Sequence, residues 1–376
     1  MSITKIDKNF DTSFECPKDV KWHSILDNRF SIYGVSYSEE EKIFRRFPKT
    51  FAGTISESVE ALAKHTSGGR VRFKTNSSYI VLYVEEPFEE PFPHMAISGK
   101  NGVSIYINGK FTNIIAPSYH QITNADPNFG GNGKIVFDGI VHPSELDGRE
   151  YQVEIYLPLY SGVRNIFIGL DGSSSILPPK PYKHEKPVIF YGSSITQGGC
   201  ASKPGDDYPG RLSRMIDVNY VNYGLSGNAK AEPEMADFIA KQSASIFVLD
   251  YDHNAPDSEY LKTTHFALYK TVRDINPETP IIIMTMPAFD ENKQKPINKA
   301  RRDVIFKTLE KAKKLGDKNI YLIDCYGCFG SLSNGECGTV DGCHPDSLGF
   351  LRMSEKIYPV LNCLLNDISK SRKRNI

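Results

Sequence analysis

The sequence predicts a two-domain protein: an all-β, jelly-roll-like sandwich precedes a flavodoxin-like α/β domain with a doubly wound parallel sheet. Residues 50–171 consist of short alternating apolar runs separated by turns, a pattern typical of antiparallel strands. Four prolines between Pro178 and Pro187 then indicate a stiff linker. After Pro187, apolar runs alternate with helical stretches, as in a parallel sheet covered on both faces. The predicted boundaries are 1–178 for the sandwich, 179–186 for the linker and 187–376 for the α/β domain.

Six runs in the first domain are typical of strands, because apolar and polar residues alternate along them. The dipeptide Asn108-Gly109 divides the third run and is the strongest short signal for a hairpin. Residues 56–65 show a helical period instead. Many short strands at this spacing predict a jelly-roll-like sandwich. The expected strands lie at 70–77, 79–87, 102–111, 133–141, 151–159 and 164–172.

Five strand-like runs in the second domain are each followed by a helical stretch. Because these runs are apolar on both faces, they indicate a parallel sheet with helices on both sides. Ligands of such sheets bind at the carboxyl ends of the strands, so functional residues are expected directly after a strand. The strands are expected at 188–192, 218–224, 245–252, 280–287 and 319–325, and the helices at 208–216, 232–242, 258–275, 297–316 and 347–368.

Composition excludes several classes of function. Lysine plus arginine and aspartate plus glutamate each number 45, so net charge gives no basis for binding nucleic acid or an anionic membrane. No apolar run approaches the ~20 residues that span a bilayer, and the N-terminus lacks the apolar segment of a secretory signal. Seven cysteines without such a signal favour reduced thiols. We therefore expect a cytoplasmic protein with no nucleic-acid or membrane partner, and the oligomeric state stays open.

Two groups of residues contain side chains of types that can bind metal ions. Structural zinc sites usually repeat a tight Cys-x-x-Cys spacing, and the second cysteine pair here is wider than the first. Asp250 and Asp252 form an acidic pair, but a hard cation needs six or more oxygen ligands. We therefore predict no metal site and no cofactor. The four cysteines concerned are Cys325, Cys328, Cys337 and Cys343.

Residues suited to acyl hydrolysis follow the strands of the second domain. A serine hydroxyl becomes a good nucleophile only when a base takes its proton, and histidine suits that role near neutral pH. An aspartate orients the imidazole, and N–H donors stabilise the oxyanion that forms. Together these residue types predict serine hydrolysis at one edge of the sheet. They are Ser193 and Ser194 after the first strand, Gly224 and Gly227 after the second, Asn254 after the third, and Asp341 and His344 before the last helix.

The order of these blocks resembles that of the SGNH (GDSL) hydrolase superfamily. The α/β-hydrolase elbow G-x-S-x-G does not fit, because Thr196 stands at its fifth position. "YGSSITQGG", "NYGLSGNA", "DYDHN" and "DGCHP" instead look like the four superfamily blocks, over residues 187–368. By position, the resemblance implies a nucleophile, a base, its orienting carboxylate and an oxyanion hole. These are Ser194 (nucleophile), His344 (base), Asp341 (orienting partner), and Gly227 and Asn254 with the Ser194 backbone N–H (oxyanion hole).

The chain departs from the superfamily pattern at two blocks. Ser193 stands where the first block usually has aspartate, and we interpret it as a supporting hydrogen-bonding residue. In the third block, Asp252 and His253 precede Asn254 where the pattern is Gly-x-Asn-Asp. His253 therefore stays outside the predicted catalytic set.

Two look-alike segments in the first domain are set aside because of their surroundings. Residues 172–174 repeat Gly-Ser-Ser, but the linker follows them and no helix completes a strand–turn–helix unit. Asp138 and His142 precede a proline like the last block, but they are four residues apart and lie in the predicted sandwich.

The first domain suggests the substrate. "FRRFP", "GVSIYINGKF" and "VEIYLPLY" look like the sandwich that precedes the esterase domain in some bacterial members, several of which are carbohydrate O-acetyl esterases. The resemblance implies a serine esterase acting on O-acetyl esters of a small molecule or oligosaccharide, with the sandwich as a wall of the cleft. The alternatives are a lipase, thioesterase or general short-chain acyl esterase of the same fold, and a carbohydrate-binding protein without catalysis. Polar, glycine-rich loops favour small or sugar-linked substrates over long acyl chains.

Overall fold

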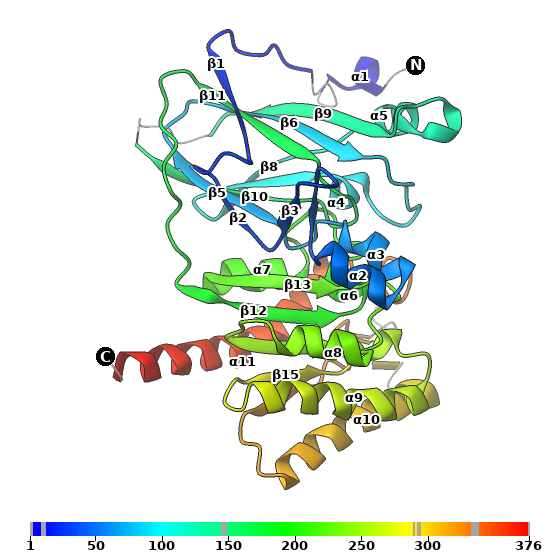
Figure 1. The fold of residues 1–376 in the computed structure, drawn as a ribbon. Coiled ribbons are helices and arrows are strands. Elements are labelled where there is room, and N and C mark those ends of the chain that lie inside the picture. Colours follow the sequence, from blue (N-terminus) through cyan, green and yellow to red (C-terminus); the bar gives the residue numbers. More distant parts are fainter. Residues whose placement is uncertain are drawn as a thin grey trace.

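The computed structural model of the chain describes residues 3–8, 13–143, 149–288, 290–291, 295–331 and 338–374. Two layered units are stacked on one another, with the N-terminal β-sandwich on one side and the α/β domain on the other (Figure 1). This confirms the predicted fold class. Among the described helices, none combines the length and the apolar character needed to cross a membrane.

The sandwich is built from two antiparallel sheets around an apolar core. One sheet has the order β1-β11-β6-β9 and the other the order β2-β5-β10-β7-β8. All six predicted runs form strands, and the Asn108-Gly109 hairpin has φ angles of 50° and 79°, as a two-residue turn with left-handed backbone requires. The bounds are β1 Val20–Ser24, β2 Ser31–Tyr33, β5 Arg70–Thr75, β6 Ile80–Pro87, β7 Val103–Ile107, β8 Lys110–Ile115, β9 Lys134–Val141, β10 Tyr151–Tyr156 and β11 Asn165–Asp171.

Several short elements decorate the sandwich. The helix α5 begins with a capping box, because the Ser118 hydroxyl accepts the Gln121 N–H while the Gln121 side chain accepts the Ser118 N–H. This pattern is readable in the sequence, but no helix was predicted there. The elements are α1 Ile3–Ile6, β3 Ser36–Ser38, β4 Ile43–Arg45, α4 Ile97–Lys100, α5 Tyr119–Ala125 and the 3₁₀ helix η2 Pro127–Phe129.

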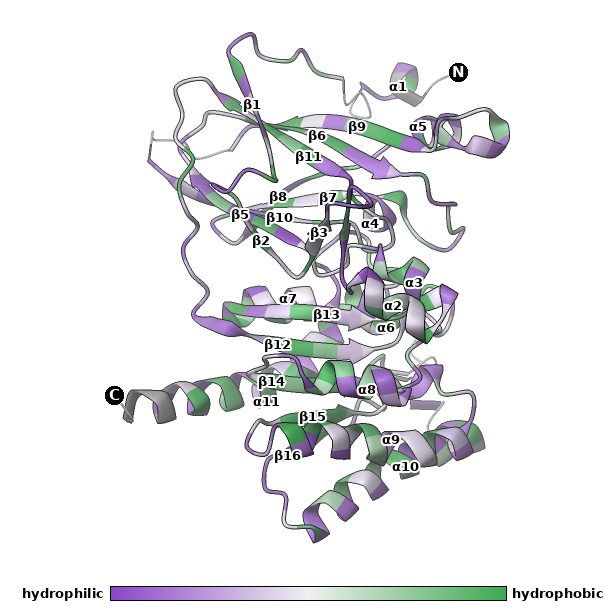
Figure 2. Ribbon diagram, viewed as in Figure 1, coloured by the Kyte–Doolittle hydropathy of each residue, from purple (hydrophilic) through white to green (hydrophobic). Residues whose placement is uncertain are grey.

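The α/β domain has five parallel strands in the order β13-β12-β14-β15-β16, which is the flavodoxin-like order. Hydrophobic residues concentrate on these strands (Figure 2), and the polar side chains follow them. Strand β12 begins at His184, inside the predicted linker. The strands are β12 His184–Gly192, β13 Val218–Gly224, β14 Ile246–Asp250, β15 Ile281–Met284 and β16 Ile320–Ile323.

The predicted helices of this domain are present, together with two short ones at the edge of the sheet. The short ones, α6 and the 3₁₀ helix η3, directly follow β12 and β14 and carry candidate site residues. The bounds are α6 Ser194–Gln197, α7 Tyr208–Ile216, α8 Pro233–Ala240, η3 Asp252–Asn254, α9 Ser258–Ile275, α10 Pro296–Lys314 and α11 Ser347–Arg374.

The two domains share a hydrophobic core as well as a linker. Helices α2 (Lys49–Ile55) and α3 (Glu57–Ala63) belong to the N-terminal segment but lie beside α6, β13 and α8 of the α/β domain (Figure 1). Their buried side chains pack in the same core as the second domain. Arg46 is fully enclosed at this junction and donates to the Gly224 carbonyl at 2.5 Å, directly at the end of β13. Burial lowers the pKa of Arg46 to about 10, so the guanidinium stays charged at neutral pH.

Candidate active site

Ser194 lies at the point where β12 ends and α6 begins. The preceding Ser193 caps α6, because its hydroxyl accepts the Ile195 N–H at 3.2 Å, as an N-cap serine does. Gly192 fits because an added Cβ would lie 2.1 Å from the Thr196 hydroxyl and 2.3 Å from the Asp250 carbonyl oxygen. The sharp turn thus requires glycine at position 192 and a helix-capping residue at position 193. The hydroxyl of Ser194 is not used in the cap and can make other contacts.

The Ser194 hydroxyl meets a histidine from the loop before α11. Its Oγ lies 2.9 Å from Nε2 of His344, and Nδ1 of His344 lies 2.7 Å from Oδ2 of Asp341. The second carboxylate oxygen of Asp341 accepts the backbone N–H groups of His344 and Cys343 at 2.7 and 3.0 Å. With the proton of the neutral ring on Nδ1, facing the carboxylate, Nε2 presents its lone pair to the serine.

The charge of Asp341 suits this geometry. Burial by itself raises the pKa of the carboxyl, but the hydrogen bonds from the His344 ring and from the backbone outweigh it and lower the pKa to about 2. Asp341 is therefore a carboxylate at neutral pH. The side chain of Ser194 is nearly buried and that of His344 is 22 % exposed, so a substrate can reach the pair from one side.

The two side loops that were predicted to bind an oxyanion lie at the same edge of the sheet. Gly227 follows β13 with φ +68°, and an added Cβ there would meet no atom within 4 Å, so its backbone borders open space. Asn254 ends η3 after β14, and its Oδ1 accepts the Ala229 N–H at 3.2 Å. This bond ties the two loops together and leaves the Nδ2 amide of Asn254 as a donor.

Buried aspartates below the edge of the sheet support the turn. Oδ2 of Asp250 accepts hydrogen bonds from the hydroxyls of Thr196 and Tyr208, both at 3.1 Å. Burial raises the pKa of Asp250 to about 6. Asp252 accepts the Met286 N–H, and burial together with the charge of Asp250 raises its pKa to about 7. Both carboxyl groups therefore serve hydrogen bonds within the domain.

His253 lies close to His344. Burial, with the positive charges of Arg301 and His344, lowers the pKa of His253 to about 3, so its ring is neutral at physiological pH. Of the four cysteines considered in the sequence, Cys325 is buried just after β16, and Cys343 is exposed in the loop of His344. Cys337 lies outside the described residues.

The first domain supplies site residues that the sequence did not reveal. Tyr160 donates its hydroxyl to the carbonyl of Ser194 at 3.2 Å, and the Ser67 hydroxyl donates to the carbonyl of Gln197 at 2.5 Å. The ring of His94 lies 5.8 Å from that of His344 between centroids. These residues hold and flank the turn of Ser194 from the sandwich side. Because these contacts join positions 34 and 130 residues apart for Tyr160 and Ser67, and still farther apart for His94, no local pattern could have indicated them.

The comparisons with known proteins agree with the two-domain fold. Residues 185–362 match the GDSL-like Lipase/Acylhydrolase family, and residues 20–176 match the GxDLY family, described as the N-terminus of the SGNH-hydrolase type of esterase. The parallel sheet, with the candidate site at its carboxyl edge, places the second domain in the α/β class. Within that class, the chain belongs to the SGNH (GDSL) hydrolase superfamily and has the two-domain layout predicted from its sequence. Among curated protein sequences, no match to the chain is found.

Solved structures share both domains. A protein described as a GDSL-like lipase from Bacteroides ovatus ATCC 8483 is 27% identical, with a TM-score of 0.79 over 92% of this chain and 98% of the other. The salicylyl-acyltransferase SsfX3 of a tetracycline biosynthetic pathway is 18% identical, with a TM-score of 0.70 over 91% and 96%. A family two carbohydrate esterase from Clostridium thermocellum in complex with cellohexaose is 13% identical, with a TM-score of 0.59 over 90% and 99%.

Proposed function

We propose that the protein is a serine esterase that removes small acyl groups, in the first place O-acetyl groups from carbohydrates. The observation that carries the proposal is the continuous hydrogen-bonded chain from Ser194 through His344 to Asp341. It lies at the carboxyl edge of a parallel sheet, where ligands of this fold class bind.

In the first half of the reaction, Ser194 Oγ attacks the ester carbonyl carbon while His344 Nε2 accepts its proton. The carboxylate of Asp341 stabilises the imidazolium. The carbonyl oxygen becomes an oxyanion, for which the Ser194 N–H, the Gly227 N–H and the Asn254 Nδ2 amide are the proposed donors. Collapse of this intermediate breaks the bond to the alcohol oxygen, which receives the proton from His344.

In the second half, water replaces the alcohol. His344 accepts a proton from water, the hydroxide oxygen bonds to the acyl carbon, and the same donors hold the second oxyanion. Breakdown releases the acid, and His344 returns the proton to Ser194 Oγ. Every catalytic group in this cycle belongs to the chain, so the proposed reaction uses only water as a second reactant.

The substrate class rests on the surroundings of the serine. The exposed His94 of the sandwich and polar, glycine-rich loops of the α/β domain lie beside the serine and His344. An imidazole and polar loops suit a polar alcohol better than a long alkyl chain. Carbohydrate esterases share the two-domain fold, which supports an oligosaccharide ester. The alternative is a general short-chain esterase, lipase or thioesterase.

One experiment tests the class of reaction and the acyl length together. The purified chain is assayed with 4-nitrophenyl acetate and octanoate, and acetate release is then measured from a panel of acetylated oligosaccharides. We expect faster hydrolysis of the acetyl ester, acetate release from at least one oligosaccharide, and full activity after treatment with a chelator. A serine-directed phosphonate should label Ser194, as located by peptide mass spectrometry. Faster octanoate hydrolysis would favour the lipase alternative, and sugar binding that phosphonate labelling leaves intact, without hydrolysis, would favour a binding protein.

A further inference from the structure

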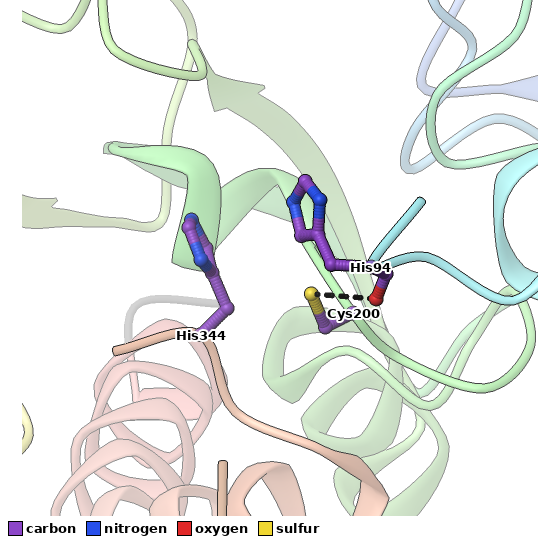
Figure 3. A group of neighbouring side chains, drawn as sticks. All are labelled: His94, Cys200 and His344. Carbon is purple, nitrogen blue, oxygen red and sulfur yellow. Dashed lines mark hydrogen bonds between the residues drawn. The ribbon is translucent and has the colours of Figure 1, made fainter. Parts of the chain in front are cut away.

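Three metal-ligand side chains from distant parts of the chain converge beside the nucleophile. His94 comes from the sandwich, Cys200 from the turn after α6, and His344 from the loop before α11. Figure 3 shows the two imidazole rings and the thiol around one common space. One ligand atom from each residue lies within 4.8 Å of the other two.

We propose that His94, Cys200 and His344 form a binding site for a borderline-soft divalent cation such as Zn²⁺, and that an ion bound there switches the enzyme off. The inhibition rests on the proposed role of His344 as the base, whereas binding of the ion does not. The ion would be a reversible inhibitor and takes no part in hydrolysis. The prediction that the chain has no metal site rests only on ligands that are close together in the sequence.

The ligand set matches the chemistry of Zn²⁺. Thiolate sulfur and imidazole nitrogen are ligands that zinc prefers, and three protein ligands plus one water complete a tetrahedral sphere. Bonds of about 2.0 Å to nitrogen and about 2.3 Å to sulfur place neighbouring ligands roughly 3.5 Å apart. The site must therefore contract by about 1 Å. His94 can move in this way, because it is the exposed member of the three.

His344 is already oriented as a zinc ligand. Metal-binding histidines commonly give one ring N–H to a carboxylate and the other nitrogen to the ion. In this chain Nδ1 faces Asp341 at 2.7 Å, so Nε2 is the nitrogen available to the ion. That same nitrogen accepts the Ser194 hydroxyl. Ion binding and activation of the nucleophile therefore compete for one lone pair.

Cys200 is held in place by an unusual backbone. Its φ is +70°, a left-handed conformation that is uncommon for residues other than glycine. The preceding Gly199 lets the turn approach the ring of His344, since an added Cβ would lie 3.2 Å from Cδ2 of that ring. The nearly buried thiol donates weakly to the backbone carbonyl of His94 at 3.5 Å (Figure 3). On binding, the thiol proton passes to solvent and the sulfur bonds to the ion.

The first test is inhibition of ester hydrolysis by added Zn²⁺, in buffer with a reductant that lacks thiols. We expect Zn²⁺ to inhibit the chain, a chelator to restore activity, and Mg²⁺ or Ca²⁺ to have no effect, because hard cations prefer oxygen ligands. In Cys200→Ser and His94→Ala, the Zn²⁺ concentration for half-inhibition should rise by at least about tenfold, since loss of even indirect partners of metal ligands costs about that much. Each variant is compared with its own activity without metal.

Two other cysteines serve as matched controls. Cys343 is next to His344 in sequence, and Cys363 is exposed on α11. Cys343→Ser and Cys363→Ser should retain the wild-type response to Zn²⁺. If Cys343→Ser loses the response and Cys200→Ser keeps it, the assignment of Cys200 is wrong. If His94→Ala, a change on the exposed surface, leaves the response intact, the assignment of His94 is wrong.

The second test measures binding without activity. Ser194→Ala should lack esterase activity but still bind one Co²⁺ per chain, with the near-ultraviolet absorption of a thiolate-to-cobalt bond and the visible bands of a tetrahedral ion. Cys200→Ser should lose the thiolate absorption. Absence of that absorption in Ser194→Ala would overturn the site even if the proposed esterase function holds. If the absorption is present but no ester is hydrolysed by the wild type, the site stands and the proposed function fails.

Discussion

Residues 172–174 and 192–194 are both Gly-Ser-Ser, but they lie in different surroundings. In the first copy, Ser173 and Ser174 donate their hydroxyls to the side chain and the carbonyl of Asp171 at 2.7 Å, within a turn at the end of β11. In the second copy, Ser194 starts a helix at the edge of a parallel sheet and meets an imidazole nitrogen. The same tripeptide closes a surface turn in one place and presents the proposed nucleophile in the other.

The Asp/His pairs differ in the same way. Asp138 lies on the exposed face of β9, and His142 follows the end of that strand, also exposed. Asp341 and His344 lie in one tight loop. One carboxylate oxygen of Asp341 accepts the backbone N–H of His344, and the other faces Nδ1 of the His344 ring. A separation of three residues between aspartate and histidine on a loop thus allows the carboxylate to contact both the backbone and the ring of the histidine. The comparison teaches that the position of a motif relative to the sheet decides its chemistry.

The largest effect is expected from alanine at the two serine turns. Ser194→Ala should lower kcat/KM for an acetyl ester by on the order of 10⁴- to 10⁶-fold, because the nucleophile is lost. Ser174→Ala should leave it unchanged, since it removes only a surface hydrogen bond. The measurement is initial rates, with circular dichroism to show that both variants fold. Substantial activity in folded Ser194→Ala would remove the basis of the proposed mechanism.

The next effect is expected at the two aspartates. Asp341→Asn should lower kcat by about 10³- to 10⁴-fold, because the imidazole loses the partner that fixes its tautomer and stabilises its charge. Asp138→Asn is the matched control on the exposed face of β9 and should change neither the rate nor the stability measurably. Equal rates in the two variants would contradict the role of Asp341.

A smaller loss is expected at the proposed oxyanion donor. Asn254→Ala should lower kcat by about 10²- to 10³-fold with little change in KM, since the donor acts on charge that develops in the transition state. Asn254→Asp keeps an oxygen to accept the Ala229 N–H but removes the Nδ2 donor, so its loss should be at least as large. Wild-type kcat in Asn254→Asp would show that the side chain only links the two loops.

Much of the α/β fold and of the candidate site could be predicted from the sequence. Both depend on the local periodicity of apolar residues and on the rule that ligands bind at the carboxyl ends of parallel strands. The alternation of strands and helices located the sheet, and the rule for carboxyl ends of parallel strands grouped Ser194, Asn254 and His344. Strand β1 was missed because most of its side chains are exposed or half-buried, so it lacks the apolar alternation of a core strand.

The contacts between the domains could not be predicted in the same way. Arg46 binds the carbonyl of Gly224, which is 178 residues away, and Ser67 binds that of Gln197, 130 residues away. Each contact uses a backbone carbonyl, which any residue possesses, so no residue type marks the partner. The placement of His94 beside His344 has the same origin, because it follows from the docking of the sandwich.

The smallest effect concerns two carboxyl groups, one in each domain, with opposite pKa shifts. Glu86 is fully buried in the sandwich, and burial raises its pKa to about 8, although Asn101 and Ser161 donate to it. The folded chain therefore holds this proton at pH values where the unfolded chain has lost it, and the free energy of unfolding falls as pH rises from about 4.5 to about 8. At about 1.4 kcal/mol per pKa unit, the fall is at most a few kcal/mol.

Glu86→Gln should remove this fall, as measured by urea unfolding at pH 5 and pH 9. Asp341→Asn is the control, because the pKa of Asp341 is lowered to about 2 and its contribution to stability is lost only as pH falls below its ordinary value of 3.8. Its substitution should therefore leave in place the fall in stability that is due to Glu86. If Glu86→Gln instead shows the same pH dependence as the wild type, Glu86 carries its charge in the folded sandwich. Of the two opposite pKa shifts, only the lowered pKa of Asp341 would then remain. That shift has a clear cause, because the His344 ring donates a hydrogen bond to the carboxylate.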